Sequence, residues 1–278
     1  MANVFEESLF SKYPEEYDEV TKQAISFTAI YCGDTIIRDT IFEIVTNYAK
    51  KRGLSVEILR YPFRDDELWA FTFVKSGTIF LCVNSELAIC KQIFAVAHEL
   101  YHIYCYAENT DLDTIESGSV LVSKTVDDKA VTREDSKANA FAGLILMPGK
   151  MLNQQLVIFG IKGNSVTVDD VLTLMELFAL PYKAVVLRLA ENNNITKSRV
   201  KELLSYDNKY IMGRIELTGK AQRWQQNRKD DQYYGSLLDD MNYNRENELL
   251  TKSRDDSDIE YLNKIKDEFS KPSIEVIN

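Results

Sequence analysis

Two histidines stand four residues apart in the run His98-Glu99-Leu100-Tyr101-His102, and a glutamate directly follows the first. On an α-helix, side chains four residues apart lie on one face, so these two imidazoles could grip one metal ion. Neutral imidazole is a good zinc ligand, and a catalytic zinc keeps one position open for water. Glu99 could then act as general base on that water. The H-E-x-x-H pattern therefore predicts a zinc-dependent peptidase with Glu99 as its catalytic residue.

The alternative to a metal site is a chance match, because this pattern also occurs in helices that bind no metal. The chain contains two histidines in all, and both stand in the motif. The motif also follows directly on a β-rich run, as site helices of metallopeptidases commonly do. These two observations favour the metal site.

A third protein ligand must be a residue other than histidine, because no histidine remains. Cys105 shares the helical face of His98 but lies about 10.5 Å further along the axis, too far to share one ion easily. Glu134 and Asp135, at the start of a second predicted helix, are better placed. Asp135 could instead form a capping box with Thr132, because acids favour the first turn of a helix. Spacing alone leaves both roles of Asp135 open.

The elements that must position these residues can be predicted from apolar periodicity and turn residues. A helix is expected at residues 18–52, followed by three strands at 54–59, 68–74 and 78–83. A second helix at 86–106, a surface loop at 107–131 and a third helix at 132–146 complete the order. Gly53 ends the first helix, and Ser76-Gly77 predicts a hairpin between the last two strands. This order predicts an α+β domain over residues 18–150.

The second half of the chain has a different pattern. Three short helices, expected at residues 168–179, 182–191 and 196–204, predict a helix-turn-helix-like subdomain over 164–205. Residues 206–278 are polar and charge-mixed, and predict a C-terminal extension of short surface helices. The net charge of -10 and the absence of a strong Lys and Arg excess in the subdomain argue against direct DNA binding. We therefore expect the subdomain to pack on the first domain.

The sequence shows no signal for export or for membrane insertion. The first 17 residues carry four glutamates and lack a basic start followed by an apolar core. No apolar run approaches the roughly 18 residues needed to span a bilayer. The four cysteines show no C-x-x-C spacing and are interpreted as reduced, buried thiols. We expect a cytoplasmic protein with no membrane partner.

Three stretches outside the histidine pair carry a likeness to known proteins. They are Val83-Asn84-Ser85 ahead of the motif, Ala138-Asn139-Ala140-Phe141-Ala142 with the following Leu146-Met147-Pro148, and Val186-Leu187-Arg188-Leu189. The second is similar to A-N-x-F-A-x-x-L-L-M-P and the third to S-x-x-A-x-x-x-R-L, both of the ImmA/IrrE family of metallopeptidases. The chain resembles this family over about residues 25 to 200. The resemblance implies a small sheet packed on zincin-type helices that carry the H-E-x-x-H motif.

The resemblance also bears on the metal ligands. The family usually places a glutamate three residues before the first alanine of A-N-x-F-A, and this position holds Asp135 here. Asp135 is therefore implied as the third ligand beside His98 and His102, with Glu134 as the alternative. Zn²⁺ is the expected metal, and Mn²⁺ is the alternative because a site of two nitrogens and one oxygen accepts both.

The biological role comes from the resemblance alone. Short members of the family are typically anti-repressors of phages and integrative elements, or stress regulators, which cleave a helix-turn-helix transcriptional repressor. Such a repressor is the implied substrate. The strand over residues 78–83 would be the sheet edge that pairs with an extended substrate, through Thr78, Phe80 and Cys82. The alternative is a non-proteolytic regulator that acts by binding DNA or protein, against which the intact motif argues.

Overall fold

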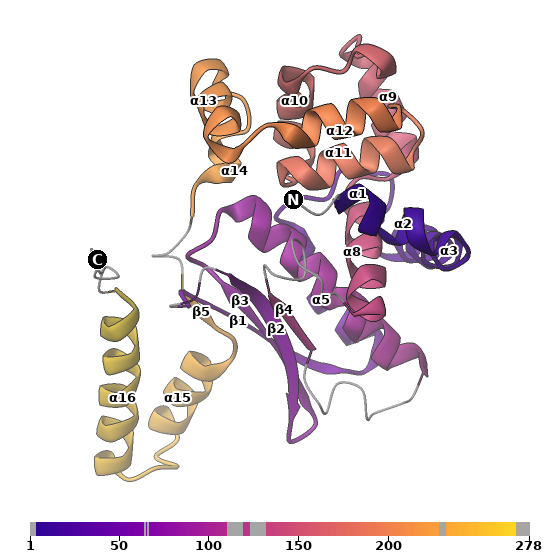
Figure 1. Ribbon diagram of the computed structural model, residues 1–278. Helices are drawn as coiled ribbons and strands as arrows, with labels where there is room; N and C mark the ends of the chain where they lie inside the picture. The colour runs from indigo at the N-terminus through magenta and orange to yellow at the C-terminus, as the bar shows by residue number, and fades with distance from the viewer. Residues whose placement is uncertain are drawn as a thin grey trace.

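The computed structural model describes residues 4–63, 65, 67–109, 119–122, 132–227 and 232–270. Its centre is one mixed sheet with helices above it (Figure 1). The strands are β1 (Ser55–Tyr61), β2 (Leu68–Lys75), β3 (Thr78–Asn84), β4 (Ser119–Val122) and β5 (Tyr233–Tyr234). They lie in the order β4-β2-β3-β1-β5. Together with the helices, the sheet confirms the predicted α+β class.

The hairpin predicted at Ser76-Gly77 is present and joins β2 to β3. Both turn residues have positive φ, 52° and 79°, as a two-residue turn between twisted strands requires. The earlier strand β1 pairs in parallel with β3, along the edge of β3 that faces away from β2. The placement of residues 78–83 at a sheet edge is therefore wrong, because β3 is paired along both sides. Thr78, Phe80 and Cys82 all have register partners in both β1 and β2.

The helices before the sheet differ from the single helix expected at residues 18–52. α1 (Val4–Glu7) and α2 (Leu9–Lys12) precede α3 (Pro14–Tyr31), and α4 (Ile41–Arg52) follows after a break. Gly33, just after the end of α3, has a φ of +65° that an L side chain rarely adopts, so the helix cannot run through it. Gly53 closes α4 in the left-handed conformation, as predicted.

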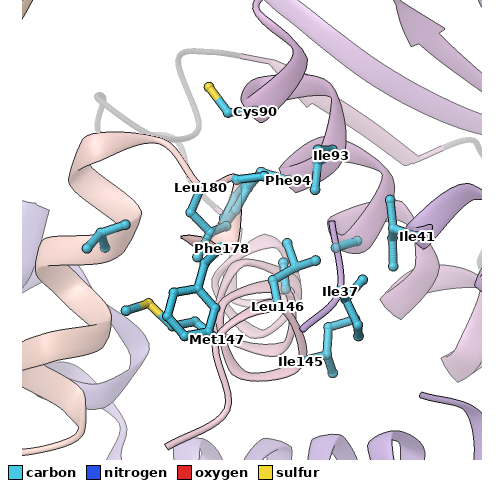
Figure 2. Close-up of a cluster of buried hydrophobic side chains, with 14 of the residues drawn as sticks. Ile37, Ile41, Cys90, Ile93, Phe94, Ile145, Leu146, Met147, Phe178 and Leu180 are labelled. Carbon is cyan, nitrogen blue, oxygen red and sulfur yellow. The ribbon is translucent and has the colours of Figure 1, made fainter. Parts of the chain in front are cut away.

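Two helices form the centre of the core, the first packed on the sheet and the second packed on the first. They are α5 (Ile89–Asn109) and α8 (Arg133–Leu146). The residues of α5 around the motif are fully buried, including Ala95, Ala97 and Leu100. Figure 2 shows part of this core, in which Ile93 and Phe94 from α5 lie beside Ile145 and Leu146 from α8 and Phe178 and Leu180 from a later segment. Burial on several sides fixes α5 as a rigid carrier for the histidines.

The three predicted short helices are present as α10 (Val168–Phe178), α11 (Tyr182–Glu191) and α12 (Lys197–Ser205). The helix α9 (Gly149–Ile158) and the 3₁₀ turn η1 (Gly163–Ser165), which were not predicted, lie between α8 and α10. Arg188 of α11 is 3% exposed. It donates to the Met147 carbonyl, to the Tyr17 hydroxyl at 2.9 Å and to the Glu191 carboxylate at 2.6 Å. This buried network ties α11 to the end of α8 and to α3. Whether these helices act as a helix-turn-helix unit stays a prediction.

The last part of the chain returns to the sheet. It contains α13 (Asn208–Thr218), α14 (Gln222–Gln225), β5, α15 (Leu237–Glu246) and α16 (Lys252–Ser270). Trp224 donates from Nε1 to the Glu176 carbonyl at 2.9 Å, and the Ile89 amide donates to Gln226 at 2.9 Å. β5 pairs antiparallel with β1. Residues 208–227 thus contact both α10 and the start of α5, while α15 and α16 lie beyond β5 (Figure 1).

Two further findings concern membrane-spanning helices and the cysteines. Within the described part of the chain, no helix has the length and apolar character needed to cross a membrane. The four cysteines are free thiols, of which Cys82 and Cys90 are buried and Cys32 and Cys105 are half-buried.

Candidate metal centre

The two histidines of the motif face one another on α5. Their Nε2 atoms are 3.3 Å apart, and their ring centroids are separated by 5.2 Å. The His98 side chain is fully buried, while that of His102 is 13% exposed. Helix α5 therefore presents two imidazole nitrogens toward α8. That of His98 is buried, and that of His102 belongs to a side chain that solvent can reach.

Asp135 completes the group from the first turn of α8. Its Oδ1 lies 3.9 Å from Nε2 of His98 and 4.0 Å from Nε2 of His102. The three ligand atoms lie within 4.8 Å of one another. Two ligand atoms that share one zinc at about 2.0–2.2 Å each can be at most about 4.4 Å apart, and all three of these separations satisfy that limit. The residues therefore fit a single divalent ion.

Glu134, the alternative third ligand, does not lie in this group. Its side chain is exposed, whereas the Asp135 side chain is 13% exposed and turned toward the imidazoles. The two residues are consecutive on a helix and point about 100° apart. The geometry brings Asp135 to the histidines.

Asp135 also forms the capping box that competed with the ligand role. Its Oδ2 accepts from the Thr132 hydroxyl at 2.6 Å and from the Thr132 amide at 3.2 Å. The Asp135 amide donates to Thr132 Oγ1 at 3.1 Å. Because the cap uses Oδ2 and the imidazoles face Oδ1, the two roles are compatible.

A hydrogen bond from α8 sets the orientation of the deeper histidine. Nδ1 of His98 lies 2.9 Å from Oδ1 of Asn139. An amide oxygen is an acceptor, so this contact favours the His98 tautomer with its proton on Nδ1, which leaves the lone pair of Nε2 for a metal. This role of Asn139 was not predicted from the sequence. Its spacing was the available signal, since Asn139 follows Asp135 by four residues and shares its helical face.

Burial keeps both imidazoles in the neutral form. The pKa of His98 is lowered well below 6.5, first by burial and then by the neighbouring His102, although the bond to Asn139 opposes this. Burial also lowers the pKa of His102, against the charges of Asp135 and Glu134. Metal binding needs neutral imidazole, so the surroundings prepare both residues as ligands at neutral pH.

Glu99 follows His98 on α5, and its side chain is held by a hydrogen bond from the sheet. Its side chain is fully buried, and its Oε2 accepts from the Thr72 hydroxyl at 2.6 Å. Thr72 belongs to β2, which packs directly under α5. No local sequence pattern reveals this contact, because it joins residues 27 positions apart in elements that come together only in the fold. The carboxylate is thereby fixed at the junction of sheet and helix.

A comparison with known families matches this region of the chain. The profile of the IrrE N-terminal-like domain, Peptidase_M78, matches residues 52–190, half of the chain. This span runs from the end of α4 to α11 and includes the histidine pair, Glu99, Asp135 and Asn139. No curated protein matches the chain. The chain belongs to the Peptidase_M78 family of IrrE N-terminal-like metallopeptidases.

Proposed function

We propose that this metallopeptidase is a zinc-dependent endopeptidase, with His98, His102 and Asp135 as metal ligands and Glu99 as general base. The observation that carries the proposal is the convergence of two imidazole nitrogens and one carboxylate oxygen beside a buried glutamate. Two nitrogens and one oxygen suit zinc, and Mn²⁺ is the alternative for the same donor set. A bound ion would polarise the substrate carbonyl and acidify a water.

The residues of the chain supply the remaining chemistry. The Glu99 carboxylate takes the proton of the attacking water and then delivers it to the leaving amine nitrogen. The hydrogen bond from Thr72 holds Oε2 in place during both transfers. Asn139 keeps the proton of His98 on Nδ1. These roles are supported by the contacts that α5 makes with β2 and with α8.

The proposed substrate is a helix-turn-helix transcriptional repressor, and the support for it is the resemblance to anti-repressors and stress regulators of the family. With β3 inside the sheet, an extended substrate segment would pair instead with β4, which lies at one edge of the described sheet. Ser119 of β4 is the register partner of Thr72, the residue that contacts Glu99. Neighbouring strands are about 4.8 Å apart, so a segment on β4 would lie two spacings, roughly 10 Å, from the β2 strand that contacts the general base.

The test is cleavage by Glu99→Gln, with Glu108→Gln on the same helix as the control. Glu99→Gln should keep the metal and the fold but lose cleavage by at least about 100-fold, the scale of acid–base help. Glu108 pairs with Arg52 at the surface, so its variant should cleave like the wild type. The substrates would be purified helix-turn-helix repressors, beginning with one encoded beside this gene, and products would be identified by mass spectrometry.

Two outcomes would contradict the proposal. Unchanged cleavage by Glu99→Gln would overturn the general-base assignment. Displacement of a repressor from its operator DNA without cleavage, equally in the presence of a chelator, would favour the non-proteolytic regulator instead.

A further inference from the structure

The two carboxylate oxygens of Asp135, at the start of α8, make different contacts. Oδ2 accepts hydrogen bonds from the amide and the hydroxyl of Thr132, and Oδ1 faces the two imidazoles. We propose that Thr132 is a positioning residue of the metal centre, which holds the Asp135 carboxylate in the orientation that ligates. This inference rests on the proposed function, because it takes Asp135 as a metal ligand.

The hydrogen bonds define how the carboxylate is held. A carboxylate on a single methylene can rotate about two bonds, and a ligand that must be ordered on binding loses affinity for that ordering. The Thr132 hydroxyl at 2.6 Å and its amide at 3.2 Å fix the position of Oδ2 before any ion arrives. The Asp135 amide, which donates to Thr132 Oγ1 at 3.1 Å, closes the ring of contacts. Oδ1 is then directed at the imidazole pair without further adjustment.

Thr132 reaches the metal through Asp135 alone, as an outer partner of a ligand does. Removal of such a partner usually costs about 10–100-fold in metal affinity. The competing explanation is that Thr132 only caps the helix, in which case its loss would lower stability and leave the metal affinity unchanged. The two explanations differ in what they predict for metal binding by a correctly folded variant.

A matched control lies on α10, which begins with the same arrangement. Oδ2 of Asp170 accepts from the Thr167 hydroxyl at 2.7 Å and from the Thr167 amide at 2.8 Å. The Asp170 amide donates to Thr167 Oγ1 at 3.2 Å. Among the described residues, Asp170 is not part of a group that could hold a metal. Thr167→Ala therefore removes an equivalent cap at a distance from the metal.

The experiment measures Zn²⁺ affinity of the full chain by competition with a chromophoric chelator, and the Co²⁺ absorption spectrum as a report of ligand geometry. Thr132→Ala should weaken Zn²⁺ binding by about 10–100-fold and alter the Co²⁺ spectrum, and Thr132→Ser should restore both. Thr167→Ala should bind both ions like the wild type. Thr132→Gly separates cap from ligand, because glycine is a tolerated N-cap whose introduction costs little stability. It should fold well and still bind Zn²⁺ weakly.

Failure of the inference is distinguishable from failure of the proposed function. If Thr132→Ala and Thr132→Gly bind Zn²⁺ as tightly as Thr167→Ala, while Asp135→Ala does not, Asp135 is a ligand and the positioning role of Thr132 is overturned. If Asp135→Ala binds Zn²⁺ like the wild type, the proposed ligand set fails and the inference falls with it.

Discussion

Helices α8 and α10 begin with the same local structure, a threonine N-cap and an aspartate three residues later, but their surroundings differ. Each aspartate accepts two hydrogen bonds through Oδ2 from its threonine. Oδ1 of Asp135 faces two imidazoles, whereas α10 presents the neighbouring Asp169 to Arg214 of α13. T-x-x-D therefore specifies a helix start, and the partner helix decides whether that start also faces metal-ligating side chains.

The difference between the two helix starts arises from packing further along α8. Ala138 and Ala142 are fully buried, and these small side chains let α5 approach closely. Phe141 contacts both α5 and α3, since its ring centroid lies 5.3 Å from that of Tyr101 on α5 and 5.6 Å from that of Phe27 on α3. This contact sets the rotation of α8 and so turns Asp135 toward the histidines.

The largest effect is expected from Asp135→Ala, compared with Asp170→Ala. Asp135→Ala should lower the affinity for Zn²⁺ by more than the roughly 100-fold that marks the loss of an outer partner, because a direct ligand is removed. Asp170→Ala should leave the affinity unchanged. Both variants lose half of a capping box, so the free energy of unfolding of the metal-free protein should fall by similar amounts, about 1 kcal/mol or less.

Chelator competition would measure the affinities, and thermal unfolding without metal would measure the stabilities. A result in which the two variants bind Zn²⁺ equally well would remove the functional difference between the helix starts.

The sequence predicts the histidine pair well because two ligands on one helix are a matter of local spacing. It could not separate ligand from cap for Asp135, because both roles require an acid at this position. The edge placement of residues 78–83 is wrong because β3, after its hairpin with β2, also pairs in parallel with the earlier strand β1, and this long-range pairing has no local signal. Likewise β5 is a two-residue strand defined by its partner β1 and by no pattern of its own. Local signals predict elements, and long-range packing selects their neighbours.

A smaller effect on the stability of the metal-free protein is expected from a change of pH. It arises at the start of α8, where the imidazoles of His98 and His102 face the capping box, and not at the start of α10. Burial lowers the pKa of His98 and of His102 below the ordinary 6.5. The unfolded chain therefore takes up protons at higher pH than the folded chain does. Stability contributed by the neutral imidazoles is present above about pH 6.5 and is lost as the pH falls below it. The metal-free protein should thus unfold at lower denaturant concentration at acidic pH.

The measurement is a series of urea titrations across this pH range, with the double variant His98→Gln and His102→Gln as control. The control lacks histidine altogether and should lose less stability over the same interval. The two imidazole signals in the NMR spectrum of the folded metal-free protein should titrate below 6.5, that of His98 lowest. Titration of either at or above 6.5 would contradict the prediction.

The smallest effect is expected from Glu134→Gln, which tests the neighbour of the ligand. Glu134 is exposed and points about 100° away from Asp135, so its carboxylate does not join the imidazole pair. Its charge nevertheless acts on the site, since it raises the pKa of His102, less than Asp135 does. Removal of that charge should weaken Zn²⁺ binding only on the scale of an exposed charge pair, about 0.2–1 kcal/mol.

The loss caused by Glu134→Gln should also shrink as salt is added, because an exposed charge is screened and a direct bond to the metal is not. Glutamine keeps the length of the side chain and the first turn of α8, so the comparison isolates charge. Zn²⁺ titrations at low and high salt would give both values. A salt-independent loss larger than that of Asp135→Ala would reverse the assignment and make Glu134 the ligand, with Asp135 left to cap α8 as Asp170 caps α10.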